Sequence, residues 1–563
     1  MDGLTRVHRW QLAIALLGGL LLVSVLGLAS LDYTTVLIPA RGGVYREGVA
    51  GAPRYLNPLL ASFNLVDQEL NQLLYRGLAR FDEQGRVVPD LAEGWEISPD
   101  ARVYTVRLQP GYFWQDGTPV TLEDVLFTYR TLQSPEFPGD PTVTGLWQQV
   151  AIERVDSWTV RFTLPEPFAP FLDELTHGLL PAHKWRDVPP RLMPESQLNF
   201  QPVGNGPFYV DALNSTAVIL KSNPYFPGPE PYLEALEIRF YPDDAAVIEA
   251  YRRGEVDAIG RVLPRLVSQV GSLPDVQLFF STVPGYTIVL LNWQNPNVPF
   301  FQDINVRRAL LYALDREAIV EEQLRGMGIV AHTPFLPNTW AYTEEVTRYT
   351  YNPDRARALL TEAGWVDQDG DGVREKEGRA LRFILLSDDD PTRVAVAQRL
   401  AAFWAEVGVE AIPQIVTFAG LVNDFLVPRR FEAALVAWRL YGDPDPYPLW
   451  HSTQVEEGQN YSGWQNVEVD ELLETARRTP DLNRRIRLYR EFQRIFAQEV
   501  PGLLLYHPVE GFAVRNTVRN VHIGPWQQPG DRYRTIAQWY IRVRRVPVTA
   551  VTPTPQSPEG SIR

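Results

Sequence analysis

Acidic side chains at alternate positions form the clearest chemical pattern in the sequence. In the segment Asp367-Gln368-Asp369-Gly370-Asp371-Gly372, carboxylates can converge on a calcium ion, and glycine permits the sharp turn that such a loop needs. Glu375 takes the ninth position, but the twelfth, where a full calcium loop has a bidentate glutamate, is Gly378. We interpret the segment as a turn, with a calcium site as the alternative. The ligands of that alternative are Asp367, Asp369, Asp371 and Glu375.

The nucleophilic and acid–base residues form no catalytic motif. The sequence has no cysteine, which excludes disulfides, thiol nucleophiles and cysteine-ligated metals. None of the seven histidines lies in a His-Glu-x-x-His pattern, and neither a Gly-x-Ser-x-Gly elbow nor a phosphate loop occurs. A carboxylate pair for glycoside hydrolysis stays open, because two of the 68 acids could meet from distant positions. We expect a binding protein without a cofactor rather than an enzyme.

Composition bounds the possible partners and the number of domains. The formal net charge of −15 argues against nucleic acid, whose binding proteins present basic surfaces to phosphates. Apolar residues make up 45% and charged residues 21%, which is the balance of a globular protein. A chain of 563 residues is too long for one hydrophobic core, so several domains are expected.

The N-terminal region predicts a membrane segment. Residues 10–31 carry no charge and as a helix would rise about 33 Å, enough to cross a bilayer. Arg6 and Arg9 precede them, which places residues 1–9 in the cytoplasm and the bulk of the chain outside. The alternative is a signal peptide cleaved near Ala29-Ser30, which also implies export. At the other end, the polar, proline-rich residues 546–563 predict a disordered tail.

Between these ends, strand and helix patterns alternate. Polar and apolar residues alternate over 104–108 and 158–164, as in half-buried strands. Thr121 followed by acidic residues predicts a helix start, and apolar residues recur at helical spacing over 306–314 and 486–496. The alternation predicts an α/β fold.

Seven longer motifs in a fixed order carry a family resemblance. They are Tyr55-Leu56-Asn57-Pro58, Leu74–Leu78, Pro89–Trp95, Tyr104–Val125, Val203–Phe208, Gly254–Asp257 and Val306–Arg316. In this order they resemble the large extracellular solute-binding proteins of ABC importers (family 5), which include oligopeptide-, dipeptide- and nickel-binding proteins. Most of these motifs are turn chemistry, which identifies the fold rather than the site.

The resemblance implies a fold of two lobes that close on a ligand, with an extra domain inserted in the first lobe. It implies a monomer that passes an oligopeptide or similar solute to an ABC permease. A membrane-anchored secreted hydrolase and a permease-independent peptide sensor or chaperone are the alternatives. The expected parts are 42–82, 200–280 and 504–545 for the first lobe, 83–199 for the inserted domain, and 281–503 for the second lobe.

The resemblance also suggests ligand-binding residues. In peptide-binding relatives, a tryptophan matching Trp438 is followed three residues later by an aspartate that pairs with the peptide's α-ammonium. Here that position is Tyr441, which we keep as a candidate ligand-binding residue. Asp443 or Asp445 could replace the aspartate through a shifted loop, with Asp443 as the candidate, although both also suit a simple Asp-Pro turn. Arg439 could anchor a carboxylate or phosphate, or pair with a surface carboxylate.

Two further residues are weaker pocket candidates. Asn57 is one by its motif, and Trp293 by its position after an apolar strand. The missing aspartate leaves peptides, sugars, metal chelates and other solutes open.

Overall fold

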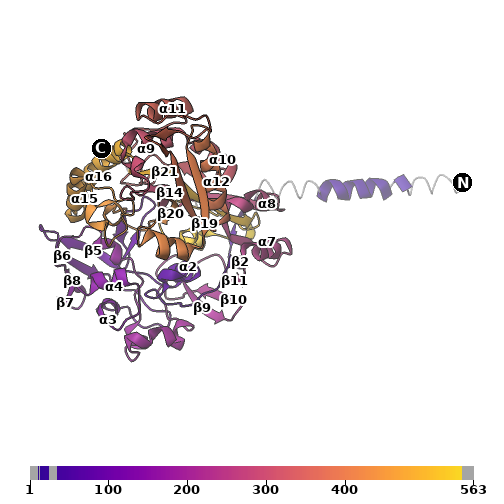
Figure 1. Cartoon of the computed structure of the whole chain (residues 1–563). Helices are drawn as coiled ribbons and strands as arrows, with labels where there is room; N and C mark the ends of the chain where they lie inside the picture. Colours follow the sequence, from indigo (N-terminus) through magenta and orange to yellow (C-terminus); the bar gives the residue numbers. More distant parts are fainter. Residues whose placement is uncertain (1–9, 12, 25–34, 548–563) are drawn as a thin grey trace, which may run out of the picture.

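The computed structural model describes residues 10, 11, 13–24 and 35–547. Residues 35–547 form a body of two lobes with an inserted domain, and the described N-terminal helix lies apart from it (Figure 1). The expected cytoplasmic residues 1–9 and residues 548–563 of the expected tail lie outside the described ranges. So do residue 12 and residues 25–31 of the expected membrane segment, whereas 13–24 are helical. Within the described ranges, no helix is long and apolar enough to span a bilayer.

One twelve-stranded sheet runs through both lobes. Its strands are β2 (Val44–Ala50), β9 (Phe208–Leu213), β10 (Ala217–Ser222), β11 (Ala235–Tyr241), β12 (Ala258–Val262), β13 (Val276–Thr282), β14 (Gly285–Leu291), β15 (Gly328–Val330), β18 (Arg382–Asp388), β19 (Glu410–Val416), β20 (Ala433–Arg439) and β21 (Gly502–Arg515). Their order is β19-β18-β20-β14-β21-β12-β2-β11-β10-β9, and β13 and β15 also pair with β21.

Strand β21 belongs to both lobes. Its first residues, Gly502 to Pro508, pair with β14 and β15 of the second lobe. Its last residues, Val509 to Arg515, pair with β13, and Gly511 to Val514 also pair with β12 of the first lobe. The expected change of lobe at residues 503/504 therefore falls inside one continuous strand.

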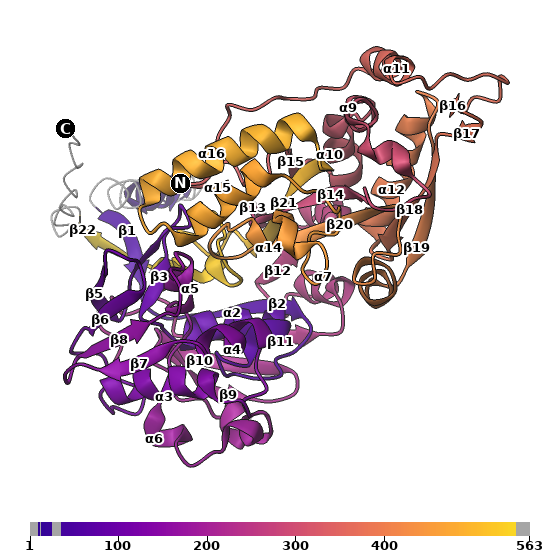
Figure 2. The ribbon, with the colours of Figure 1, turned by 60° about the vertical axis from the view of Figure 1, so that its left-hand side comes forward.

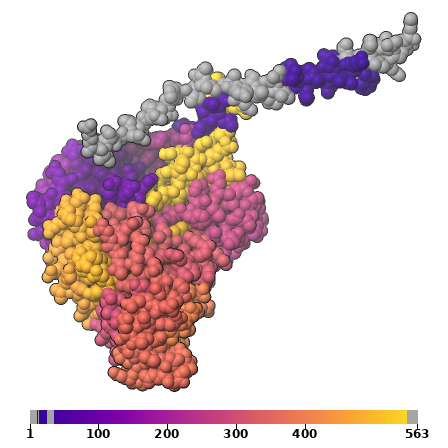
Figure 3. Space-filling view, turned by 90° about the horizontal axis from the view of Figure 1, so that it is seen from above, coloured from indigo at the N-terminus to yellow at the C-terminus, as the bar shows by residue number. Residues whose placement is uncertain are grey.

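The first lobe packs α2 (Leu65–Leu74), α7 (Asp244–Arg252) and α8 (Val267–Gly271) on its strands. The hairpin of β3 (Ala79–Phe81) and β4 (Val87–Pro89) leads into the inserted domain. In the space-filling view, the yellow C-terminal residues lie against purple and magenta residues of this half of the molecule (Figure 3).

The inserted domain is a four-stranded sheet with short helices. Its strands are β5 (Ala92–Ile97), β6 (Val103–Leu108), β7 (Ala151–Arg154) and β8 (Thr159–Thr163), in the order β5-β6-β8-β7. Its helices are α3 (Leu122–Gln133), α4 (Pro141–Trp147), α5 (Phe171–Glu174) and α6 (Ala182–Trp185). The strands predicted over 104–108 and 158–164 are confirmed as β6 and β8. Thr121 starts α3 through a capping box with Asp124, also as predicted.

The second lobe buries both faces of its strands. Alternate residues of β14 point to opposite cores: Val289 and Leu291 join one, and Ile288 and Leu290 the other. The helices that cover these faces are α9 (Ile304–Tyr312), α10 (Arg316–Leu324), α11 (Pro353–Glu362), α12 (Pro391–Ala405), α13 (Phe418–Gly420), α14 (Tyr447–Trp450), α15 (Val467–Arg478) and α16 (Leu482–Glu499). The predicted helices over 306–314 and 486–496 correspond to α9 and α16, and α15 and α16 pack side by side (Figure 2). A small hairpin, β16 (Glu375–Lys376) with β17 (Arg379–Ala380), follows α11.

The first and last strands of the body pair with each other. β1 (Thr35–Ala40) and β22 (Arg542–Pro547) form an antiparallel ribbon, with Thr35 opposite Pro547 and Ala40 opposite Arg542. Figure 2 shows this ribbon at the edge of the body. The chain therefore enters and leaves the body at one place.

Candidate ligand-binding site

A cavity of about 790 Å³ lies where the first lobe, the inserted domain and one loop of the second lobe meet. The first lobe lines it with residues between 58 and 81 and between 528 and 534, and the inserted domain with residues between 140 and 143 and between 173 and 178. The second lobe contributes Tyr441 and Gly442. Its volume is that of an ordinary small-molecule site, and an interface between domains is a usual place for one.

Most charges around this cavity are paired. Arg76 forms an ion pair with Asp90, and Arg534 with Asp531 at 2.7 Å. Nε2 of His177 lies 3.3 Å from a carboxylate oxygen of Glu174. Burial opposes protonation of this histidine, but the hydrogen bond and the charge of Glu174 raise its pKa overall.

The loop after β20 is fixed by two ion pairs. Arg485 donates to both carboxylate oxygens of Asp443, at 2.5 and 2.6 Å, and to the hydroxyl of Tyr489 at 2.9 Å. Arg477 lies 2.9 Å from the carboxylate of Asp445. Asp443 thus reaches the site region, but with both oxygens already bonded to a cation; direct ligand binding by Asp443 stays a prediction.

Trp438 lies near the end of β20, within the aromatic cluster of the second lobe. Its ring meets those of Tyr286 and Trp450 edge to face, with centroids 5.4 and 6.1 Å apart. The side chain is half-buried and is not among the residues that line the cavity, whereas Tyr441 is. A half-buried ring keeps surface free for a solute, so the predicted contact stays untested.

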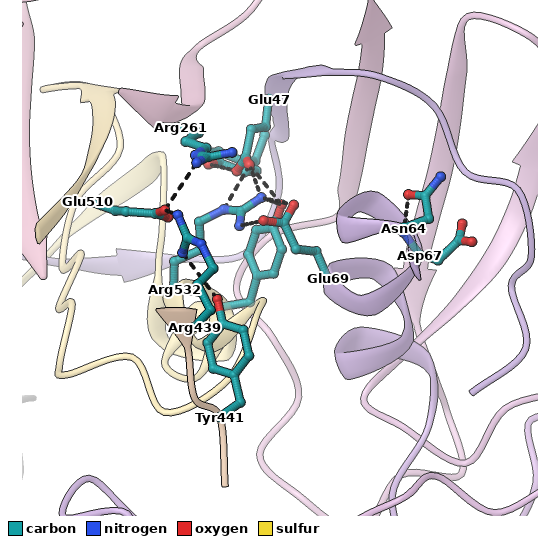
Figure 4. Close-up of polar contacts among 11 residues, drawn as sticks. Glu47, Asn64, Asp67, Glu69, Arg261, Arg439, Tyr441, Glu510 and Arg532 are labelled. Atoms are coloured by element: carbon teal, nitrogen blue, oxygen red, sulfur yellow. Dashed lines mark hydrogen bonds and ion pairs between the residues drawn. The ribbon is translucent and has the colours of Figure 1, made fainter. Parts of the chain in front are cut away.

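Arg439 takes part in a charge network that joins the lobes (Figure 4). It pairs with Glu510 of β21, which also lies 3.2 Å from Arg261 of β12, and its Nη1 donates to the hydroxyl of Tyr441 at 3.3 Å. Burial disfavours the charge of Glu510, but the two arginines hold its pKa below the usual range. Arg439 therefore has a carboxylate partner within the protein.

A second cluster in Figure 4 is buried beside this network. Arg532 lies 2.8 Å from Glu47 and 2.6 Å from Glu69, and the hydroxyl of Tyr533 also donates to Glu47 at 2.8 Å. These side chains satisfy one another inside the first lobe, as buried charges must.

The two weaker candidates take up packing positions. Asn57 is fully buried, and its Oδ1 accepts a hydrogen bond from the Leu59 amide at 3.0 Å, which shapes the turn that carries Pro58 to the cavity. The guanidinium carbon of Arg307 lies over the ring of Trp293, 3.8 Å from the ring centroid, and Trp293 does not line the cavity.

The acidic loop brings its predicted ligands together. One carboxylate oxygen from each of Asp367, Asp369, Asp371 and Glu375 lies within 4.8 Å of the others. Hydrogen bonds from the amides of Gly370 and Gly372 to Asp367 also account for this geometry as a turn. Calcium binding there stays a prediction.

Sequence reasoning missed Asp173, which lines the cavity from α5 and accepts a hydrogen bond from the Asp443 amide. Its helix has only four residues and carries no motif. Its neighbours in space come from positions up to about 270 residues later, so no local pattern could have revealed it.

Comparisons with known proteins point to one family. Residues 86–460 match the family described as bacterial extracellular solute-binding proteins, family 5 Middle. The chain is 28% identical over 512 residues to the oligopeptide-binding protein AppA of Bacillus subtilis, which covers 89% of this chain and 92% of that protein. It is 26% identical over 504 residues to the dipeptide-binding protein of Escherichia coli, with 84% and 91% covered.

Solved structures show the same architecture. AppA of Bacillus subtilis, in complex with a nonapeptide, matches with a TM-score of 0.69 at 27% identity, covering 90% of this chain and all of that one (100%). NikZ of Campylobacter jejuni, in complex with Ni(L-His), matches with a TM-score of 0.70 at 25% identity, covering 88% and 99%. One fold thus carries ligands as different as a nonapeptide and a nickel–histidine complex.

Proposed function

Because the chain belongs to family 5 of the bacterial extracellular solute-binding proteins, we propose that it captures an oligopeptide or similar small solute between its lobes and delivers it to the permease of an ABC importer. The observation that carries the proposal is the cavity of about 790 Å³ at the meeting point of three parts of the molecule. The peptide-binding names of the two sequence relatives support a peptide as the solute.

The place of action follows from the family, whose members are extracellular. We further propose that residues 10–31 remain on the protein as an anchor and that the body works as a monomer. N-terminal sequencing of protein extracted from its native membrane tests the anchor, and a mature chain that begins near Ser30 would contradict it. Size-exclusion chromatography with light scattering tests the monomer.

The solute can be identified directly. The full chain is purified in mild detergent from its native host and denatured, and the small molecules released are analysed by mass spectrometry. Peptides in the released fraction, absent when the protein is first unfolded and refolded, are the expected result. Two results together would contradict a peptide solute: the released molecule belongs to another class, and the stripped protein does not bind a peptide pool.

A further inference from the structure

The acidic side chains of the loop after β20 have no oxygen free for a ligand cation. Both oxygens of Asp443 accept hydrogen bonds from Arg485. Asp445 is paired with Arg477 through one oxygen and accepts a hydrogen bond from the Tyr447 amide through the other. A cationic group of a solute therefore needs a different carboxylate.

Asp173 is a cavity-lining carboxylate without a cation of its own. Its Oδ2 accepts a hydrogen bond from the Asp443 amide, and within the described ranges it forms no ion pair. Arg485 attracts it electrostatically, but that arginine is already held by Asp443. Burial and then the negative charge of Asp443 raise the pKa of Asp173 well above its usual range.

The other acids that line the cavity already have partners. Asp90, Asp531 and Glu174 are paired with Arg76, Arg534 and His177, respectively. Asp140 caps α4 by accepting a hydrogen bond from the Thr142 amide at 2.9 Å. Among the described residues, Asp173 therefore differs from Asp90, Asp531 and Glu174 because it has no cationic partner, and from Asp140 because it lies at the contact with the second lobe, against the Asp443 amide.

Gly442 lets the backbone of the second-lobe loop lie directly against this carboxylate. Its φ of 87° lies in the left-handed region that favours glycine, and a Cβ there would lie 2.6 Å from Oδ2 of Asp173. The loop of the second lobe can therefore rest on Asp173 without a side chain between them.

Resting on the proposed function, we infer that Asp173, contributed by the inserted domain, receives the primary ammonium group of the solute as the lobes close. The ammonium supplies the missing positive charge and up to three hydrogen-bond donors. Asp443, by contrast, stabilises the loop after β20 through its ion pair with Arg485.

The test uses the full chain, stripped of its solute by unfolding and refolding, and two peptide pools. Both contain short peptides of uncharged residues; one has free amino termini and the other is N-acetylated. Asp173→Asn keeps the size of the side chain and its acceptor for the Asp443 amide but removes the charge. Asp354→Asn is the control, because it removes one negative charge from an exposed position of α11 that does not line the cavity. Captured peptides are quantified by mass spectrometry, and melting temperature is recorded for every variant.

The unmodified protein should prefer free amino termini, and Asp173→Asn should weaken their capture by roughly tenfold to a hundredfold, the effect of losing a hydrogen bond to a charged group. The Asp354→Asn control should change this preference by no more than about twofold. If the unmodified protein takes both pools equally, or if folded Asp173→Asn keeps the preference, the role of Asp173 is overturned while the proposed function stands. If neither pool is captured, the peptide function and the inference resting on it both fail.

Discussion

Arg485 on α16 holds both carboxylate oxygens of Asp443, in the loop after β20, and both side chains are almost fully buried, with 6% and 10% exposed. A buried pair of this kind is costly to break, because removing one partner leaves the other charged, buried and uncompensated. The contact therefore stabilises the loop that carries Tyr441 and Gly442 to the cavity.

We predict that Asp443→Asn lowers the free energy of unfolding by about 3–5 kcal/mol while changing solute affinity little. Urea unfolding and calorimetric titration of the same preparation measure the two effects. Asp354→Asn is the matched control. It breaks an ion pair with Arg357 in which the Asp354 side chain is 93% exposed, so it should cost under about 1 kcal/mol of unfolding free energy. A stable variant with strongly reduced affinity would instead identify Asp443 as a ligand-binding group.

Trp438→Ala should lower both stability and affinity. Loss of the ring from its contacts with Tyr286 and Trp450 should cost about 3 kcal/mol of unfolding free energy. If the half-buried ring also packs against the solute, affinity should fall roughly thirtyfold, as for other aromatic anchors. Phe418→Ala, at an exposed position of the second lobe, controls for a general effect of losing an aromatic ring. Unchanged affinity in a folded Trp438→Ala variant would remove Trp438 from the site.

Solute binding should make the molecule more compact. The inserted domain and the second lobe touch through the Ala169 amide, which donates to the Arg477 carbonyl at 2.7 Å, and through Asp173 with the Asp443 amide. A solute that bridges these parts favours the closed arrangement only as far as it binds that arrangement better. Small-angle scattering should therefore show a smaller radius of gyration at saturation. An unchanged radius of gyration would argue against closure. In Gly442→Val the valine side chain would meet Asp173, so this variant should become less compact on binding than the unmodified protein does.

Stability should fall in mild acid because of two histidines, His507, which is buried, and His332, which is half-buried. Burial lowers the pKa of His507 to about 4, and burial together with Arg316 lowers that of His332 to about 4. The unfolded chain binds protons on these groups near pH 6.5, so their contribution to stability is complete above that pH and is lost as the pH falls towards 4. Each group makes the unfolding free energy fall by up to about 1.4 kcal/mol per pH unit across this window.

The slope of stability against pH isolates one of these groups. Nδ1 of His507 donates to the Gly285 carbonyl at 2.8 Å, and His507→Asn keeps a donor near that position. The variant should lose stability less steeply than the unmodified protein between pH 6.5 and 4.5, whatever its stability at pH 7. His522→Asn, at an exposed position, should leave the slope unchanged. Equal slopes for all three proteins would show that His507 does not titrate on unfolding.

Local patterns predicted local structure well. The capping residues Thr121 and Asp124 and the alternation over 104–108 depend on neighbours a few positions away, and both predictions were confirmed. The family resemblance supplied the two-lobed architecture, which no single pattern contains. The acidic loop could be found for the same reason, since its four carboxylates lie within nine positions of one another.

The chemistry of the cavity could not be predicted in this way. Whether Asp443 is free depends on Arg485, 42 positions later, and whether Asp173 meets the loop depends on a contact across 270 positions. Arg439 likewise finds Glu510 only because β21 passes between the lobes. Sequence reasoning named the segment of the second lobe whose Tyr441 lines the cavity, but it could not tell which charged side chains of that segment already have partners within the protein.

The pairing of β1 with β22 has a mechanical consequence. Because the strands are antiparallel, with Thr35 opposite Pro547, tension between the two ends of the body would open this ribbon one residue pair at a time, like a zipper. A pull between the N-terminal end and the lobes instead runs along β1 into β2, which is hydrogen-bonded on both sides within the large sheet and must slide past two neighbours at once. A weak force between Thr35 and Pro547 should therefore open the β1–β22 ribbon. Extracting β2 by a pull between the N-terminal end and the lobes should need a much stronger force.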